Sequence, residues 1–247
     1  MDGAICRPLI DFLEPENRLV VEIGPGGGAL TQRLVAAGGR VLAVEIDIPW
    51  AMSLSREIRS LSAQVVIGDA TEISWRHYPR GTLVTGNLPF NVSTVLIERL
   101  LPQWQTVPRA AFLVQKEVGD RLVARPGDEA YGGLSVVTAA RARVSRLGKI
   151  KRGSFRPPPK VDGVFVGLEL LEPPLGEERM AGFNSTVRLS FSQRRKQLRN
   201  SLASGWGRAV AMQALADAGI DPRSRAEELS LEKFVELHTA YRAVVPQ

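Results

Sequence analysis

A glycine-rich turn between a strand-like and a helix-like segment constrains the fold of this chain more than any other feature. The apolar run 18–23 leads into residues 24–28, four of which are glycine, and residues 29–37 then follow helical spacing. A second apolar run, 40–45, completes a strand–helix–strand unit. Such units build parallel sheets, so the sequence predicts an open α/β sheet with functional groups at the carboxyl ends of its strands.

The same alternation continues along the chain and then changes. Further strands are predicted at 64–67, 81–85, 109–114 and 161–170, and further helices at 51–61, 92–101 and 134–141. After residue 172 only helical segments are predicted, at 178–189, 194–203, 209–218 and 231–241. We therefore expect an α/β domain over residues 1–172 and a small helical domain over residues 173–247.

Basic residues are concentrated in two parts of the sequence. The net charge is +6, and two runs without any acidic residue lie at 141–160 and 188–199. A solvated basic face is one interpretation, but two such runs favour contact with nucleic-acid phosphates. The candidate RNA-binding residues are Arg152, Lys160, Arg194, Arg195, Lys196 and Arg199. The last four of these are expected to lie on one helix.

Few residues are suited to disulfide or metal chemistry. Cys6 is the single cysteine, which excludes an intramolecular disulfide framework and a cysteine-based zinc cluster. The two histidines, His77 and His238, are too few for a histidine-rich metal site, so no metal is expected. Apolar runs are shorter than the roughly twenty residues of a membrane span, and no signal-peptide pattern begins the chain. We expect a cytoplasmic protein with no membrane contact.

The glycine spacing indicates the class of ligand. Gly24-x-Gly26-x-Gly28 departs from the dinucleotide fingerprint, in which a helix N-terminus receives pyrophosphate. S-adenosylmethionine has no phosphate, and its amino-acid end can hydrogen-bond a glycine backbone. The turn therefore favours a methyltransferase over an oxidoreductase, with a simple strand-to-helix connection as the alternative.

Acidic residues end the next two strands. Glu45 is placed to accept hydrogen bonds from both ribose hydroxyls of an adenosyl group, or else to cap the following helix. Asp69 is placed to accept from the adenine amino group, or else to cap a turn before Thr71. The predicted cofactor-binding residues are Glu22, Gly24, Gly26, Glu45, Ile46, Asp69, Ala70 and Asn87.

Asn87-Leu88-Pro89-Phe90 follows the strand at 81–85 and is the candidate catalytic motif. An adenine N6 lone pair is delocalised into the ring, so the nitrogen is a poor nucleophile. Acceptance of both N6 hydrogens by the Asn87 side-chain oxygen and the Leu88 carbonyl would orient N6 for attack on a methylsulfonium. Pro89 would stiffen the turn and Phe90 would stack on the base. A turn initiated by asparagine is the alternative.

These motifs resemble the ribosomal RNA adenine N6,N6-dimethyltransferase family, over about residues 19–202. The resemblance also rests on segments 115–118 and 131–135, on Phe155-Arg156-Pro157-Pro158-Pro159-Lys160-Val161-Asp162, and on the run 191–200, Phe-Ser-Gln-Arg-Arg-Lys-Gln-Leu-Arg-Asn. It implies a Rossmann-like methyltransferase sheet with a helical C-terminal domain and favours the small-subunit branch. It further implies that Phe155 is a second aromatic face for the target base, and that the helical domain docks on the ribosomal particle.

The expected function is transfer of methyl groups from S-adenosylmethionine to N6 of adenosines in small-subunit ribosomal RNA by a monomer. Family members usually begin with a longer basic segment that carries a Gln-Asn-Phe-Leu-like motif, whereas this chain begins Met1-Asp2-Gly3-Ala4. Two alternatives therefore stay open: a non-catalytic or weakly active assembly factor that binds RNA, and a methyltransferase of large-subunit RNA.

Overall fold

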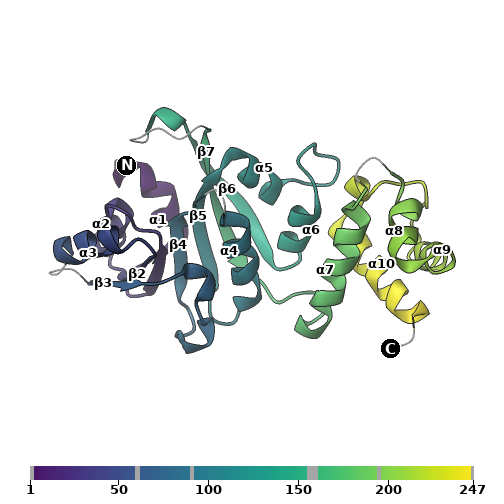
Figure 1. Ribbon diagram of the computed structural model, residues 1–247, viewed down its shortest axis with the longest axis horizontal. Coiled ribbons are helices and arrows are strands. Elements are labelled where there is room, and N and C mark those ends of the chain that lie inside the picture. Colours follow the sequence, from purple (N-terminus) through teal and green to yellow (C-terminus); the bar gives the residue numbers. More distant parts are fainter. Residues whose placement is uncertain (1–2, 59–61, 90–91, 155–160, 194–195, 246–247) are drawn as a thin grey trace. The chain divides into compact units, whose positions relative to one another are not determined.

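The chain forms two compact units in the computed structural model, whose described residues are 3–58, 62–89, 92–154, 161–193 and 196–245 (Figure 1). The sheet unit comprises residues 1–119 and 142–171, and the helical unit comprises residues 120–141 and 172–247. One boundary between the units lies between residues 171 and 172, one residue before the expected boundary, while segment 120–141 groups with the C-terminal helices. The division into functional domains at 1–172 and 173–247 stays a prediction.

The sheet unit contains a seven-stranded sheet with the order β3-β2-β1-β4-β5-β7-β6. Neighbouring strands from β3 to β5 are parallel, which confirms the predicted α/β sheet. β7 is antiparallel to both β5 and β6, so the sheet is mixed. The strands are β1 (Leu19–Ile23), β2 (Arg40–Glu45), β3 (Ala63–Ile67), β4 (Leu83–Asn87), β5 (Arg109–Gln115), β6 (Ala142–Ile150) and β7 (Gly163–Leu170).

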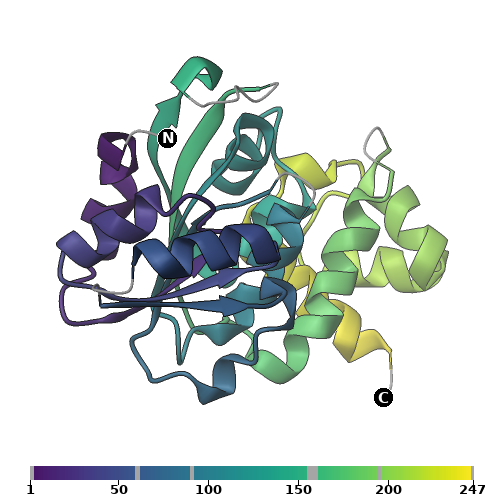
Figure 2. The ribbon, with the colours of Figure 1, turned by 60° about the vertical axis from the view of Figure 1, so that its left-hand side comes forward.

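Helices cover the sheet because its central strands are apolar on both faces. Val20, Val21 and Phe112 are fully buried in β1 and β5. α2 and α3 pack on β2, and α1 packs on β5, β6 and β7 (Figure 2). The helices that begin in this unit are α1 (Arg7–Leu13), α2 (Ala29–Ala36), α3 (Ile48–Glu57), α4 (Ser93–Leu100) and α5 (Lys116–Val123), the last of which crosses into the helical unit.

Two α-helices and one strand of the described residues were not predicted from the sequence. α1 and α5 are short helices outside the predicted set, and β6 lies inside the basic run 141–160. β6 is an edge strand whose pairing with β7 shifts register between Arg146 and Gly148. The irregularity breaks the two-residue alternation by which a half-buried strand is recognised.

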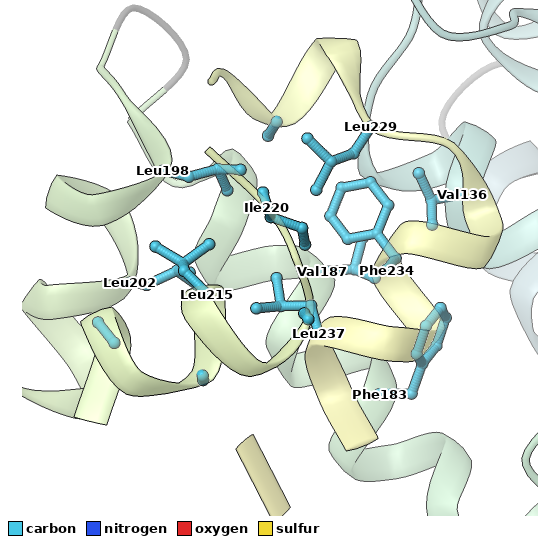
Figure 3. Close-up of a cluster of buried hydrophobic side chains, with 14 of the residues drawn as sticks. Val136, Phe183, Val187, Leu198, Leu202, Leu215, Ile220, Leu229, Phe234 and Leu237 are labelled. Carbon is cyan, nitrogen blue, oxygen red and sulfur yellow. The ribbon is translucent and has the colours of Figure 1, made fainter. Parts of the chain in front are cut away.

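The helical unit has its own apolar core, to which Phe183, Phe234, Leu215 and Leu237 contribute fully buried side chains (Figure 3). The Tyr131 hydroxyl donates a buried hydrogen bond to the Leu229 carbonyl, at 2.8 Å. This core explains why the amphipathic C-terminal segments fold together. The helices are α6 (Gly133–Ala139), α7 (Glu177–Phe191), α8 (Leu198–Trp206), α9 (Arg208–Asp217) and α10 (Leu231–Val244).

The predicted helix at 194–203 begins later than expected. α8 starts at Leu198, and Gln197 is its extended N-cap residue, so Lys196 precedes the helix. The prediction that Lys196 and Arg199 share one helix with Arg194 and Arg195 is therefore wrong for Lys196. Arg194 and Arg195 lie outside the described residues.

Candidate active site

The glycine turn takes a backbone conformation that other residues rarely adopt. Gly24, Gly26 and Gly28 have φ angles of 65°, 52° and 73°, in the left-handed region. The Gly24 N–H donates to the Val44 carbonyl at 3.0 Å, which ties the turn to β2. A Cβ built on Gly26 meets no described atom within 4 Å, so the space beside this residue is open to a ligand.

Glu45 lies at the end of β2 and faces the glycine turn. Its Oε2 accepts from the Gly26 N–H at 3.2 Å, and its Oε1 accepts from the Asp47 N–H at 3.0 Å. A carboxylate offers about four acceptor positions, so two remain for hydroxyl groups. Ile46, the next residue, is 68% exposed although it is apolar. Glu45 and Ile46 thus offer an acceptor and an apolar surface side by side.

Asp69 follows β3, which pairs with β2 so that Ile67 lies opposite Glu45. Its Oδ1 accepts from the Thr71 N–H at 2.7 Å, and this bond lowers the pKa of the Asp69 carboxyl. Asp69 therefore caps the short helix Ala70–Glu72, which is the alternative considered for it, and its contact with an adenine amino group stays a prediction. Ala70 lines a pocket of about 230 Å³ with Ile23.

Glu22 does not face the open space beside the turn. It is 1% exposed in β1, and its Oε2 accepts from the Thr31 hydroxyl of α2 at 2.6 Å. Burial raises the pKa of the Glu22 carboxyl to about 7. Glu22 contacts α2, the helix that follows the turn, and so connects β1 to that helix. Direct contact of Glu22 with a cofactor stays a prediction.

The residues after β4 form a turn fixed at both sides. Asn87 is exposed at the end of the strand, while Leu88 is buried and its N–H donates to the Leu113 carbonyl at 3.0 Å. The Pro89 carbonyl accepts from the N–H groups of Val92 and Ser93, at 3.2 and 3.1 Å. Phe90 and Phe155, the two predicted aromatic faces, lie outside the described residues.

The structure brings the glycine turn and the asparagine motif together. A Cβ built on Gly24 would lie 3.9 Å from the backbone oxygen of Asn87. Gly86 makes this approach possible, because a Cβ there would collide with the carbonyl oxygen of Ile23. Gly86 is not among the residues predicted from the sequence; a glycine inside an apolar strand just before Asn87 was the available signal.

The basic runs are not uniformly free to bind phosphate. Arg141 is buried and forms a bidentate pair with Glu177 at 2.7 and 2.8 Å, so its guanidinium is not exposed for contact with a phosphate. Arg143 pairs with Glu169 at 2.8 Å. The remaining candidates that the structure describes, Arg152, Lys196 and Arg199, have exposed side chains, while Lys160 lies outside the described residues.

The described part of the chain contains neither a membrane-spanning helix nor a metal-binding cluster. No helix there is long and apolar enough to cross a membrane. Nor do three or more His, Cys, Asp or Glu side chains of those residues group around a position that could hold a metal ion.

Comparisons with known proteins point to one family. The family model described as ribosomal RNA adenine dimethylase matches residues 7–242. The ribosomal RNA small subunit methyltransferase A of Hahella chejuensis is 37% identical over 242 residues, which cover 95% of this chain and 86% of that protein. The protein of the same name from Syntrophotalea carbinolica is 40% identical over 231 residues, which cover 91% and 86%.

Solved structures share the fold. A dimethyladenosine transferase from Plasmodium falciparum superposes with a TM-score of 0.79 at 24% identity, over 95% of this chain and 94% of that one. The 23S rRNA methyltransferase ErmE superposes with a TM-score of 0.73 at 26% identity, over 96% of both chains. These likenesses confirm the Rossmann-like methyltransferase fold. The family model over residues 7–242 and the relatives at 37 and 40% identity show that this chain belongs to the ribosomal RNA adenine dimethylase family.

Proposed function

We propose that this chain transfers methyl groups from S-adenosylmethionine to N6 of adenosines in small-subunit ribosomal RNA, dimethylates them, and acts during ribosome assembly. The observation that carries the proposal is the 3.9 Å approach between the Gly24 Cβ position and the Asn87 backbone oxygen, which joins a nucleoside-type site to an amide-bearing turn. Relatives at 37 and 40% identity are named for the small subunit, whereas the 23S enzyme is 26% identical. The small subunit is therefore the preferred substrate.

The residues around the glycine turn fit the cofactor. S-adenosylmethionine supplies an electrophilic methyl group when it is bound. Gly26 leaves open space beside a turn whose backbone can contact the amino-acid end. Glu45 is held by two backbone N–H groups and keeps acceptor positions for two ribose hydroxyls, while exposed Ile46 offers a surface to the adenine ring.

Asn87 and Leu88 act on the target base. The Asn87 amide oxygen and the Leu88 carbonyl accept the two N6 hydrogens and turn the nitrogen lone pair toward the methyl group. Bound S-adenosylmethionine would supply the methyl group, and Asn87 and Leu88 would hold N6 in the orientation in which it can accept that group and release its proton to water. The turn is preset by the hydrogen bonds of Leu88 and Pro89, so little reorganisation is required during attack.

The proposal also includes the RNA contacts, the cellular location and the oligomeric state of the chain. Exposed Arg152, Lys196 and Arg199 supply positive charge for RNA phosphates. We extend it to a cytoplasmic monomer that acts on the small-subunit particle. The candidate from another class is an assembly factor that binds the same RNA without turnover.

Transfer of tritium from labelled cofactor into purified small subunits, followed by nucleoside analysis, tests the proposal. The wild-type chain should yield N6-methylated adenosine, and Asn87→Ala should lower the rate on the order of a hundredfold or more while RNA binding is retained. Gln213→Ala, which removes an exposed amide from α9, is the matched control and should methylate normally. Wild-type rates in Asn87→Ala would refute the mechanism, and RNA binding by a wild-type chain that transfers no methyl group would favour the assembly factor.

A further inference from the structure

A second basic site lies in the sheet unit, in a groove between α1 and the end of edge strand β6. The groove has a volume of about 540 Å³. Its exposed lining residues include three basic ones, Arg7, Lys149 and Lys151. Its less exposed lining is apolar and includes Pro8, Ile150 and Phe165. It combines positive charge at the edges with a surface that a sugar ring can cover.

The walls of the groove are held in place by close packing. α1 sits tightly on β7, because a Cβ built on Gly167 would lie 2.7 Å from the ring atoms of Phe12. On the opposite wall, a Cβ on Gly148 would lie 3.6 Å from the Phe165 ring and 3.9 Å from Pro8, so glycine keeps this part of the groove open. Gly148 is also where the register shift of β6 ends, and such shifts redirect neighbouring side chains.

The charges of the three basic lining residues are largely uncompensated. Lys149 and Lys151 are exposed, and neither forms an ion pair within the described part of the chain. Arg7 is the exception, because its Nε lies 3.3 Å from Oδ2 of Asp11, which also lines the groove. Both side chains of that pair are strongly exposed, so water screens the pair and leaves Arg7 free to exchange partners.

We propose that this groove binds the phosphodiester backbone of the ribosomal RNA, with the lysines on phosphates and a ribose over the apolar lining. The inference rests on the proposed function and adds a contact outside the helical unit and outside the base site. The chain position supports it: Lys151 is four residues before Phe155, and four residues span at most about 14 Å. One RNA segment can therefore contact both places.

Lys149 lies on edge strand β6 and Lys151 follows it, and lysines at a sheet edge have another established use. They keep the exposed N–H and C=O groups of the edge from pairing with a strand of a second molecule. That role predicts that the chain self-associates when the lysines are removed and that RNA binding does not change. A phosphate site predicts weaker RNA binding without self-association.

The double variant Lys149→Ala/Lys151→Ala tests the groove. Binding to small-subunit ribosomal RNA is measured at several salt concentrations. Each lost phosphate contact removes somewhat under one counterion, so the slope of log K against log salt should become shallower by roughly 1 to 2 units. Arg33→Ala/Arg56→Ala, which lowers the net charge equally from exposed sites on α2 and α3, is the control and should change the slope much less.

Asp11→Asn supplies a second test, in which the affinity for RNA should rise and not fall. It removes the one carboxylate among the residues described as lining the groove, so RNA should bind more tightly, and most clearly at low salt. The inference is overturned if the lysine variant and the arginine control have the same slope, or if the lysine variant self-associates with an unchanged slope. It is also overturned if binding is lost only with intact subunits and not with naked RNA, which would indicate a protein partner. Absence of methyl transfer by the wild-type chain would instead count against the proposed function.

Discussion

The Glu45 carboxylate accepts a hydrogen bond from the Gly26 backbone N–H, with 3.2 Å between Oε2 and N. This bond connects the end of β2 to the glycine turn, and the second bond, from Asp47, connects it to the start of α3. One side chain thus fixes two loops at the carboxyl edge of the sheet. A ligand bound beside Gly26 meets an acceptor whose position is already set.

Glu45→Ala should weaken S-adenosylmethionine binding by about 1.5 to 3 kcal/mol, because a charged acceptor for two hydroxyls is removed. Titration calorimetry measures this loss. The substitution also leaves the Gly26 and Asp47 N–H groups without this acceptor, so the melting temperature should fall as well. Glu57→Ala, at the exposed end of α3, is the matched control and should bind the cofactor normally. An unchanged affinity in Glu45→Ala would show that the ribose assignment is wrong.

The buried carboxyl of Glu22 should make the chain less stable as pH rises. Its pKa is about 7 in the folded protein, against a usual value of 4.5, because burial disfavours the charged form. Between these values the folded state binds more protons than the unfolded state, so the free energy of unfolding falls across about pH 4.5 to 7. The loss is on the order of 3 kcal/mol. Glu22→Gln should remove this part of the pH dependence in urea unfolding, whereas exposed Glu16→Gln should retain it.

His238 should have the opposite effect in the helical unit. It is buried, its Nδ1 lies 2.9 Å from the Thr186 hydroxyl oxygen, and burial lowers its pKa below 6.5 with help from Arg242 and Arg179. The unfolded chain then binds a proton that the folded chain excludes, so stability falls as pH drops below about 6.5.

Urea unfolding of His238→Gln between about pH 5 and 8 tests this effect. The variant should be less stable than wild type at neutral pH, because the Thr186 contact changes, but its stability should decline less in acid. His77→Gln replaces an exposed histidine and should keep the wild-type acid dependence. Because the effects of Glu22 and His238 oppose each other, each is read from the difference between a variant and wild type.

The sequence predicted most accurately the strands and the glycine turn that carry the candidate site. Apolar runs ending at Ile23 and Glu45 predicted β1 and β2 closely, because buried strands must be apolar. The run ending at Ile67 predicted β3, although Val66 and Ile67 of this edge strand are exposed. Glycines with positive φ marked the turn, since few other residues adopt that conformation. The proximity of Gly24 and Asn87 followed from the rule that parallel strands present their carboxyl ends at one edge.

The features that the sequence did not predict depend on contacts between residues far apart in the chain. Arg141 belongs to an acid-free run, yet its partner Glu177 lies 36 residues further along the chain. β6 alternates imperfectly because it is an edge strand with an irregular register, so its basic residues were the stronger signal. The start of α8 was predicted too early because Lys196 and its neighbours have adequate helix propensity, which tertiary structure overrides.

Lys196 and Arg199 should contribute to RNA binding by the helical unit although only Arg199 lies on α8. Both side chains are exposed. Neutralising the pair in Lys196→Ala/Arg199→Ala should weaken RNA binding with little sequence preference and make the salt slope shallower by roughly 1 to 2 units. Cofactor affinity should stay at the wild-type value, because neither residue belongs to the glycine turn. A filter-binding series over several salt concentrations measures the slope.

The competing role for Arg199 is structural. Hydrogen bonds from Arg223 are the main cause that lowers the pKa of the Asp221 carboxyl, and the charge of Arg199 lowers it further, so Arg199 and Asp221 attract each other. If Arg199 serves chiefly to hold this corner of the helical unit, Asp221→Asn should lower the melting temperature as much as Arg199→Ala does, and the salt slope of both variants should equal that of wild type. If Arg199 contacts phosphate, Asp221→Asn should instead bind RNA at least as tightly as wild type, because a carboxylate near the phosphate has been removed.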